Sequence, residues 1–174
     1  MSARSIVIVP NKSLTTEAAV IKDINDDLCK LAADMAETMY EAPGLGLAAN
    51  QVGELLQLIV IDVAYPYAEP HDRKKSPVFI LNPRISMREG EVVKEEGCLS
   101  VPDFGVEVTR SQRVRVEGVD LDGNPVTIDA EDLLARVLQH EIDHLHGKTI
   151  LDHASTLKRG LYQRRLNKKT RRER

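Results

Sequence analysis

Apolar residues recur every three or four positions in two stretches of the chain, as they do on one face of an amphipathic helix. The first stretch predicts a helix over about 24–41, which Pro43 and Gly44 would end. The second stretch predicts a helix over about 130–147, with Asp129 as its N-cap. The apolar positions are Ile24, Leu28, Leu31, Met35 and Met39 in the first helix, and Leu134, Val137, Leu138, Ile142 and Leu145 in the second.

Strand candidates fill the middle of the chain. Leu58–Ile61 is apolar throughout, which predicts a buried strand, and Arg113–Val119 alternates as a half-buried antiparallel strand does. The three prolines of 65–77 predict a surface loop, and Gly123 with Asn124 marks a hairpin turn. Strands between terminal helices favour an α+β fold, with antiparallel or mixed sheets packed around the second helix. Shorter strands are expected at 78–81, 91–94 and 126–128.

The composition is that of a folded protein with an ordinary core. With 174 residues, of which 42% are hydrophobic and 29% charged, the chain lies far from the disordered class, and we expect residues 1–174 to form one domain. The chain has no run of 18 apolar residues and its start lacks a signal-peptide pattern, so we expect a cytoplasmic protein without a membrane span. Its two cysteines exclude a disulfide framework and leave metal binding, catalysis or burial as their roles.

Basic residues crowd the end of the chain, although the net charge is −3. Residues 158–174 hold nine Lys or Arg and one Glu, which leaves 15 basic and 26 acidic side chains for the rest, so the end carries +8 and the body −11. A last helix is expected over about 155–169, within a basic extension at about 155–174. One side of this helix would hold it to the body and the other would face outward, the two sets being Leu157, Leu161, Tyr162 and Leu166, and Arg164, Arg165, Lys168 and Lys169.

The helix expected over 130–147 carries the strongest chemical signal, an H-E-x-x-H pattern that runs from His140 to His144. Residues four apart project from one helix face, so both imidazoles can reach one metal ion while Glu141 lies beside it. The plainer interpretation is a polar helix face with two unrelated histidines. The full pattern on an amphipathic helix favours the metal site.

A catalytic metal site of this kind needs a third protein ligand, and the residues after the pattern supply poor candidates. The position six residues after His144, where some H-E-x-x-H enzymes have a histidine, is Ile150. Glu173 lies within the basic end of the chain. His146 points off the shared histidine face and His153 lies beyond the helix end, so we expect both at the surface or in a helix cap.

Cys98 is a better candidate for the third ligand. Gly97 and Pro102 flank it in what reads as an exposed turn, and a metal ion would hold its sulfur as the thiolate. Taken alone, Cys98 fits an inert buried thiol equally well. Cys29 lies on the first predicted helix without such a setting, and we assign it to packing.

Three segments together resemble the peptide deformylases. They occur in the family's order and at its usual spacing, and the likeness covers nearly the whole chain. The glycine-rich segment alone would fit a turn at the end of a helix, but the three motifs jointly are very specific. The segments are Gly44 to Gln51 (GLGLAANQ), Glu96 to Ser100 (EGCLS) and Gln139 to His144 (QHEIDH).

The resemblance implies roles for several residues of these segments and for two on the second predicted helix. Cys98, His140 and His144 would be the metal ligands, and Glu141 the general base that takes a proton from water and returns one to the leaving amine. The metal, the side-chain amide of Gln51 and the backbone N–H of Leu99 would stabilise the oxyanion. The residues that would contact the peptide are Gly44, Leu45, Gly46, Gly97, Leu133 and Val137.

The resemblance also implies a substrate, a metal and a partner. The substrate would be an N-formylmethionyl nascent polypeptide, from which formate is released. Two histidines and one thiolate with an open position would suit zinc, whereas the family resemblance implies Fe²⁺, with Zn²⁺, Ni²⁺ or Co²⁺ as substitutes. The basic end would contact the ribosome surface near the exit tunnel.

Two rival interpretations remain open at this point. In a thiol hydrolase Cys98 would be a nucleophile paired with His140, but Glu141 and His144 would then have no role. A non-enzymatic RNA-binding protein could combine a structural zinc site with the basic end. Closed structural zinc sites have four protein ligands, and the sequence offers only three convincing ones.

Overall fold

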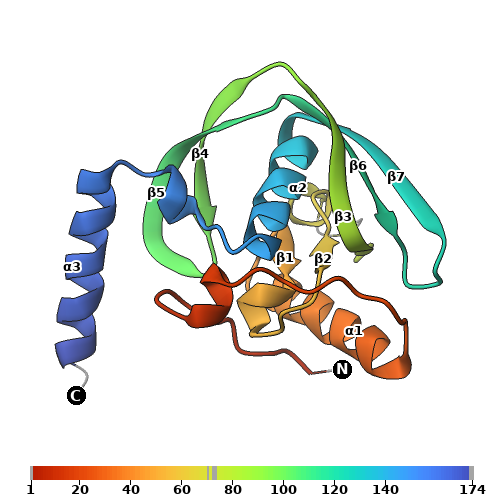
Figure 1. Cartoon of the computed structure of the whole chain (residues 1–174), viewed down its shortest axis with the longest axis horizontal. Helices are drawn as coiled ribbons and strands as arrows, with labels where there is room; N and C mark the ends of the chain where they lie inside the picture. The colour runs from red at the N-terminus through yellow and green to blue at the C-terminus, as the bar shows by residue number, and fades with distance from the viewer. Residues whose placement is uncertain (1, 70, 72–73, 173–174) are drawn as a thin grey trace.

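Five strands form an antiparallel sheet in the computed structural model, in the order β1-β2-β3-β6-β7 (Figure 1). These strands are Gly46–Ala48 (β1), Leu58–Ile61 (β2), Val78–Glu89 (β3), Arg113–Val119 (β6) and Pro125–Glu131 (β7). A second antiparallel sheet pairs Val92–Cys98 (β4) with Val101–Arg110 (β5). The structure describes residues 2–69, 71 and 74–172, the last four of them by their backbone alone. Glu173 and Arg174 of the basic extension therefore lie outside the described residues.

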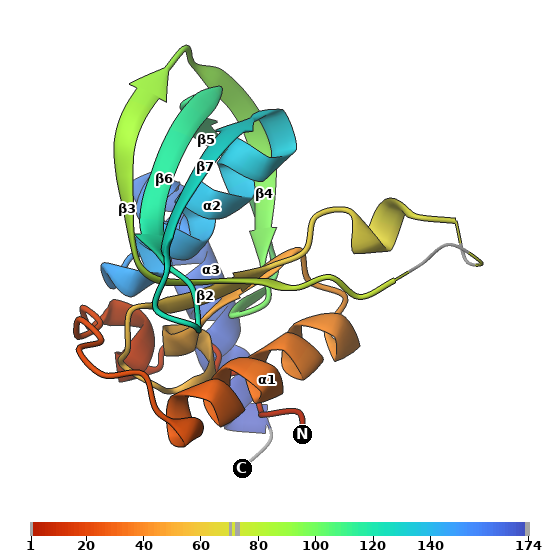
Figure 2. The same ribbon diagram turned by 90° about the vertical axis from the view of Figure 1, so that its right-hand side faces the viewer.

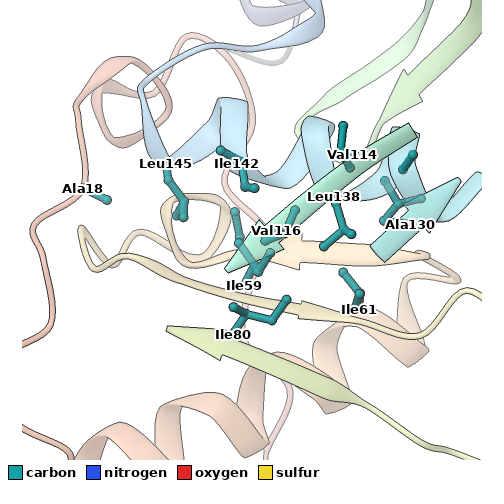
Figure 3. Packing of buried hydrophobic residues seen from close by; sticks show 13 residues of the cluster. Ala18, Ile59, Ile61, Ile80, Val114, Val116, Ala130, Leu138, Ile142 and Leu145 are labelled. Atoms are coloured by element: carbon teal, nitrogen blue, oxygen red, sulfur yellow. The ribbon is translucent and has the colours of Figure 1, made fainter. Parts of the chain in front are cut away.

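β2 is apolar and buried at every position, because helices pack on both faces of the larger sheet there. Ile59 and Ile61 pack on the face covered by α2 (Asp132–Leu145), and Leu58 and Val60 on the face covered by α1 (Asp26–Glu41). Successive side chains of a strand point to opposite faces, so one short strand contributes to two hydrophobic cores. Figure 3 shows the α2 side, where Leu138, Ile142 and Leu145 meet β2, β3 and β6.

α1 and α2 lie within the predicted spans, but both start later than expected, and α2 also ends two residues earlier, at Leu145. The side chain of Asn25 accepts a hydrogen bond from the Leu28 N–H and caps α1, so this helix starts two residues later than expected. The proposed N-cap of the second helix, Asp129, was wrong. Asp129 lies in β7, where it pairs with Arg115 across the β6–β7 ladder, and the helix begins three residues later. Sequence spacing alone could not separate the end of the strand from the start of the helix.

The strands at 58–61 and 113–119 have the predicted bounds, whereas the sheet is more extensive elsewhere. β3, β4 and β7 are longer than expected, and β1 and β5 were not predicted. Pro102 and Gly105 break the apolar alternation of β5, which nevertheless buries Val106 and Val108 in a third core. The turn at Gly123 and Asn124 joins β6 to β7 as expected.

The segment between β2 and β3 projects from the body in Figure 2, in keeping with the predicted surface loop, although residues 70, 72 and 73 lie outside the description. We expected Cys29 to pack in the core, and this was wrong. Cys29 is exposed, because its position on α1 faces away from the sheet that Leu28 and Leu31 contact. Among the described residues, no helix is both long and apolar enough to cross a membrane.

The last helix, α3 (Thr156–Arg172), covers the predicted span but docks differently. Tyr162 is buried and Leu166 partly buried, whereas Leu157 and Leu161 are exposed, so two of the four apolar residues expected at the interface do not reach it. α3 lies beside β5 at the edge of the protein (Figure 1), and of these four side chains only Tyr162 and Leu166 join the third core. Arg164, Arg165 and Lys168 face outward as expected, and the side chain of Lys169 lies outside the description.

Candidate metal centre and active-site pocket

α2 bears His140, Glu141 and His144, and its packing in the hydrophobic core decides where these side chains point. Leu138 and Ile142 bury one face of the helix against the sheet, which fixes its rotation about its own axis. His140 and His144 then lie one turn apart on a neighbouring face, with ring centroids 5.0 Å from each other. The helical spacing predicted from the sequence is therefore present.

Cys98 reaches the histidines from the end of β4. The pairing of β4 with β5 changes register between Gly97 and Cys98, and the Cys98 Sγ atom lies 3.2 Å from His144 Nε2. One ligand atom each from Cys98, His140 and His144 lie within 4.8 Å of one another. Among the described residues, this is the only such group of His, Cys, Asp and Glu side chains.

The donor set of this group fits a divalent metal ion. A thiolate with two imidazoles is a common arrangement that leaves a fourth coordination position open. Burial lowers the pKa of His144 well below its usual value and keeps the ring neutral, as a ligand must be. Burial also opposes a charge on His140, but hydrogen bonds with Cys98 and Glu96 raise its pKa well above the usual value, so metal binding would displace a proton here.

A buried ion-pair network surrounds His140, one of the candidate metal ligands. Glu96 Oε2 lies 3.0 Å from His140 Nδ1, and Arg110 donates to both oxygens of the same carboxylate at 3.0 and 3.1 Å. Arg110 also pairs with Asp143, which in turn contacts His153. Burial alone would raise the pKa of Glu96, but the hydrogen bonds from His140 and Arg110 lower it to about 2. The ionised carboxylate holds the imidazole by Nδ1, so that Nε2 is the free ligand atom.

The Glu141 carboxylate is buried beside the candidate metal ligands. It is 4% exposed, and its Oε2 atom has no hydrogen-bond partner. Burial raises its pKa to about 7. The carboxylate lies against Gly46 of β1, where an added Cβ would come within 2.7 Å of Glu141 Oε1. A glycine at this position therefore makes room for the carboxylate, which is suited to exchanging protons near neutral pH.

Gln51 presents its amide nitrogen to the same site. Its Oε1 atom accepts a hydrogen bond from the Ala48 N–H at 2.8 Å, which fixes the orientation of the amide. The Nε2 atom then donates towards Cys98 Sγ at 3.6 Å. Leu99 follows Cys98 directly and lines the same pocket.

The site opens into a pocket of about 560 Å³. Every residue that the sequence suggested for the site lines this pocket, except His144, which is buried behind it at 1% exposed. The lining residues that the sequence suggested are Gly44, Leu45, Gly46, Gln51, Gly97, Cys98, Leu99, Leu133, Val137, His140 and Glu141. Asp103 and Phe104, just beyond the cysteine motif, also line the pocket, and further lining residues that the sequence did not suggest include Glu95, Glu96 and Arg136.

The missed residues differ in how far the sequence could have revealed them. Arg136 lies four residues before His140, so the helical period places it on the pocket side of α2. Glu96 lies two residues before Cys98, which puts both on one face of a strand. Arg110 belongs to the unpredicted strand β5, and no local pattern marks it. His146 and His153 stay outside the metal-ligand group, as expected: His146 ends α2 and pairs with Glu17, and His153 pairs with Asp143.

Comparisons with known proteins agree with this site. The family model for polypeptide deformylases matches residues 3–160. A peptide deformylase of Thermodesulfovibrio yellowstonii is 45% identical over 169 residues, which cover 97% of this chain and 99% of the relative. The crystal structure of a Legionella pneumophila peptide deformylase superposes with a TM-score of 0.88 at 42% identity, covering 99% of this chain and 98% of the other.

A second solved structure, a peptide deformylase of Ehrlichia chaffeensis in complex with actinonin, superposes with a TM-score of 0.88 at 40% identity. It covers 97% of this chain, and this chain covers 98% of it. The comparisons give no support to a non-enzymatic RNA-binding protein. Likeness of this extent, along the whole chain and in three dimensions, shows that the chain belongs to the peptide deformylase family.

Proposed function

We propose that this protein removes the formyl group from N-formylmethionyl nascent polypeptides by hydrolysis, releasing formate. The observation that carries the proposal is the position of one buried carboxylate, Glu141, beside a Cys-His-His group at the bottom of a pocket. Hydrolysis of an amide needs an activated water, a group that moves protons, and donors for the oxyanion. The chain has a candidate for each.

Cys98 Sγ and one ring nitrogen each of His140 and His144 would hold the metal ion. We propose Fe²⁺ as this ion, with Zn²⁺, Ni²⁺ or Co²⁺ as substitutes. A divalent ion bound there would act as a Lewis acid that lowers the pKa of water towards neutrality. The carboxylate of Glu96 keeps the His140 ring oriented through Nδ1, as second partners of ligand histidines generally do.

Glu141 is the proposed general base. Its unpartnered Oε2 atom can accept a proton from the attacking water and then return it to the departing amine. The Nε2 group of Gln51 and the backbone N–H of Leu99 would donate hydrogen bonds to the oxygen that becomes negative as the formyl carbon turns tetrahedral. Because Ala48 fixes the Gln51 amide, this donor is oriented before the substrate arrives.

The peptide would lie along β1, where small residues let its backbone approach the edge of the sheet. Gly44, Leu45, Gly46 and Gly97 all line the pocket. Leu133 and Val137 on α2 would contact the methionine side chain. A relative of known structure holds actinonin, and we propose that the same compound binds in this pocket.

The test is release of formate from formyl-Met-Ala-Ser by protein purified without oxygen, with metal analysis alongside. We expect a chelator to abolish the activity and Fe²⁺ to restore it. The thiol-hydrolase alternative predicts the reverse, because a Cys98 nucleophile would keep its activity in the chelator and lose it to thiol alkylation. Absence of formate release from the iron-loaded protein would refute the proposed function.

We further propose that residues 1–174 form one domain that works in the cytoplasm and contacts the ribosome surface near the exit tunnel through its basic extension. Support comes from the +8 charge of residues 158–174. The side chains of Arg164, Arg165 and Lys168 are exposed along α3, which lies at the edge of the protein (Figure 1). A row of exposed cations is suited to a surface rich in phosphate.

A further inference from the structure

Tyr162 is the most deeply buried of the described side chains of α3. It is 3% exposed, whereas Leu157 and Leu161 on the same helix are 74% and 54% exposed. Its ring joins a core formed mainly by β5 and the segments around it, including Val101 and Val106. The docking of α3 on the body therefore centres on the contact of Tyr162 with β5.

Tyr162 makes two direct contacts with the start of β5. Its hydroxyl donates a hydrogen bond to the backbone oxygen of Pro102 at 2.9 Å. Its ring lies against the ring of Phe104, with centroids 4.8 Å apart and planes inclined by 54°. One turn earlier on α3, Lys158 places its Nζ atom 5.3 Å from the centroid of the Phe104 ring. Side chains from two successive turns of α3, Lys158 and Tyr162, thus contact the Phe104 ring.

The segment held in this way also forms the rim of the active-site pocket. Asp103 and Phe104 both line the pocket, and Asp103 is exposed to solvent whereas Glu141 lies buried at the bottom. Asp103 has a φ angle of +57°, a left-handed conformation that is uncommon outside glycine, although Asp adopts it more readily than most residues. The contacts of Tyr162 with Pro102 and Phe104 hold the segment on either side of Asp103.

We propose that Tyr162 is a positioning residue for the substrate: by fixing Pro102 to Phe104 it holds the rim that receives the peptide beyond its formylated methionine. The inference rests on the proposed function. Glu141 is buried and Asp103 is exposed, although both line the same pocket. The formyl group must reach Glu141, so the rest of the peptide must pass the exposed rim on its way out of the pocket. Tyr162 is not among the residues that line the pocket, and it acts through Phe104.

The test compares formyl-Met-Ala with the longer formyl-Met-Ala-Ser-Ala. Tyr162→Ala should raise KM for the longer peptide by roughly three- to tenfold, the usual weight of an aromatic pair, and leave kcat and the KM of the shorter peptide nearly unchanged. Tyr162→Phe keeps the ring contact and should restore most of the loss. Leu161→Ala, the exposed neighbour on α3, is the matched control and should behave as wild type.

A double-mutant cycle tests the route through Phe104. Phe104→Ala combined with Tyr162→Ala should raise KM no more than Phe104→Ala alone, because the ring pair is already lost. Additive effects would overturn the proposal, as would an equal rise of KM for both peptides or an unchanged KM for the longer one. Hydrogen exchange of the backbone amides of residues 103–105 gives a readout that does not require activity: it should quicken in Tyr162→Ala and not in Leu161→Ala. If exchange quickened in Tyr162→Ala but the iron-loaded wild type released no formate, only the proposed function would be refuted. Unchanged exchange in Tyr162→Ala would overturn the role of Tyr162.

Discussion

At the scale of single residues, the polar side chains of the site are held from behind so that one atom of each is left for chemistry. Glu96 occupies His140 Nδ1, and the Ala48 N–H occupies Gln51 Oε1. The atoms left for chemistry are His140 Nε2 and Gln51 Nε2. Glu141 is the exception, since its Oε2 atom is buried without a partner. A group left in this state is costly to folding and is typical of a catalytic role.

Cys98 is proposed as a metal ligand, so its replacement should act through metal content. We expect Cys98→Ser to lose iron and activity together, because an alcohol is a much weaker ligand than a thiolate. Metal analysis and formate release on the same samples check this. Cys29→Ser is the matched control: Cys29 is exposed, so its stability should change by no more than about 0.5 kcal/mol. Full activity at normal metal load in Cys98→Ser would remove Cys98 from the site.

Glu141 is proposed to move protons without holding the metal. Glu141→Ala should therefore keep its metal while turnover falls by roughly 10²–10⁴-fold, the usual contribution of general acid-base catalysis. Initial rates and metal analysis separate the two effects. Replacement of the exposed Glu107 by Gln controls for loss of a carboxylate elsewhere and should leave turnover unchanged. More than about a tenth of wild-type turnover in Glu141→Ala would contradict the assignment.

At the scale of elements, the site is made where three of them meet: α2, the end of β4 and β1. Close approach of β1 to α2 depends on Gly46, because an added Cβ would lie 2.7 Å from Glu141 Oε1. Gly46→Ala should displace the carboxylate and reduce kcat/KM by roughly 10²-fold, as misplacement of a reacting group does. Steady-state kinetics with a short formylated peptide measures this. The metal content should not change.

Gly160 on α3 provides the matched control, since an added Cβ there meets nothing within 4 Å. Gly160→Ala should leave kcat/KM unchanged and stabilise the helix by roughly 0.5–1 kcal/mol, because glycine loses more backbone entropy than alanine in a helix. If Gly46→Ala were as active as Gly160→Ala, close packing of β1 on Glu141 would not matter for catalysis.

The N-terminal segment is tied to α1 through Asp34, which gives stability a dependence on acid. A hydrogen bond from the Ser2 N–H, at 2.9 Å, and the charge of Arg4 lower the pKa of Asp34 below its usual 3.8. A carboxyl with a lowered pKa in the folded state stabilises it above 3.8, and this contribution is lost as the pH falls through the lowered pKa. The difference in unfolding free energy between wild type and Asp34→Asn should therefore be constant near neutral pH and shrink in acid. A difference that grows on acidification would have the wrong sign for this linkage.

At the scale of the whole molecule, charge is segregated between an anionic body and a cationic helix. Deletion of residues 167–174 removes five Lys or Arg and one Glu but keeps Tyr162 and Leu166. We expect kcat/KM on a short formyl peptide to stay nearly unchanged and co-sedimentation with ribosomes at low salt to fall. Full-length binding should weaken steeply with added salt, because contacts with phosphate release counterions. Equal ribosome binding by both proteins would refute the contact and leave the catalytic proposal standing.

The sequence by itself determined the features that depend on neighbours along the chain. Helical spacing placed His140, Glu141 and His144 on one turn of α2, and an unbroken apolar run identified β2. These inferences hold because the periods of a helix and a strand are properties of the backbone, whatever it packs against. Where one element ends and the next begins is less local, and there Asp129 was assigned to the wrong element.

Only the tertiary structure decided which distant side chains meet. The hydrogen bonds of Arg110 to Glu96 and Asp143 join residues 14 and 33 positions apart, and that of Tyr162 to Pro102 joins residues 60 apart. Such contacts depend on strand register and on the rotation of each helix, and one step of register would turn every side chain of a strand to the other face. The metal ligands could be proposed from motifs, but the network that orients His140 and the rim that α3 supports follow from packing, because burial excludes water and leaves each polar group dependent on the partner that the fold provides.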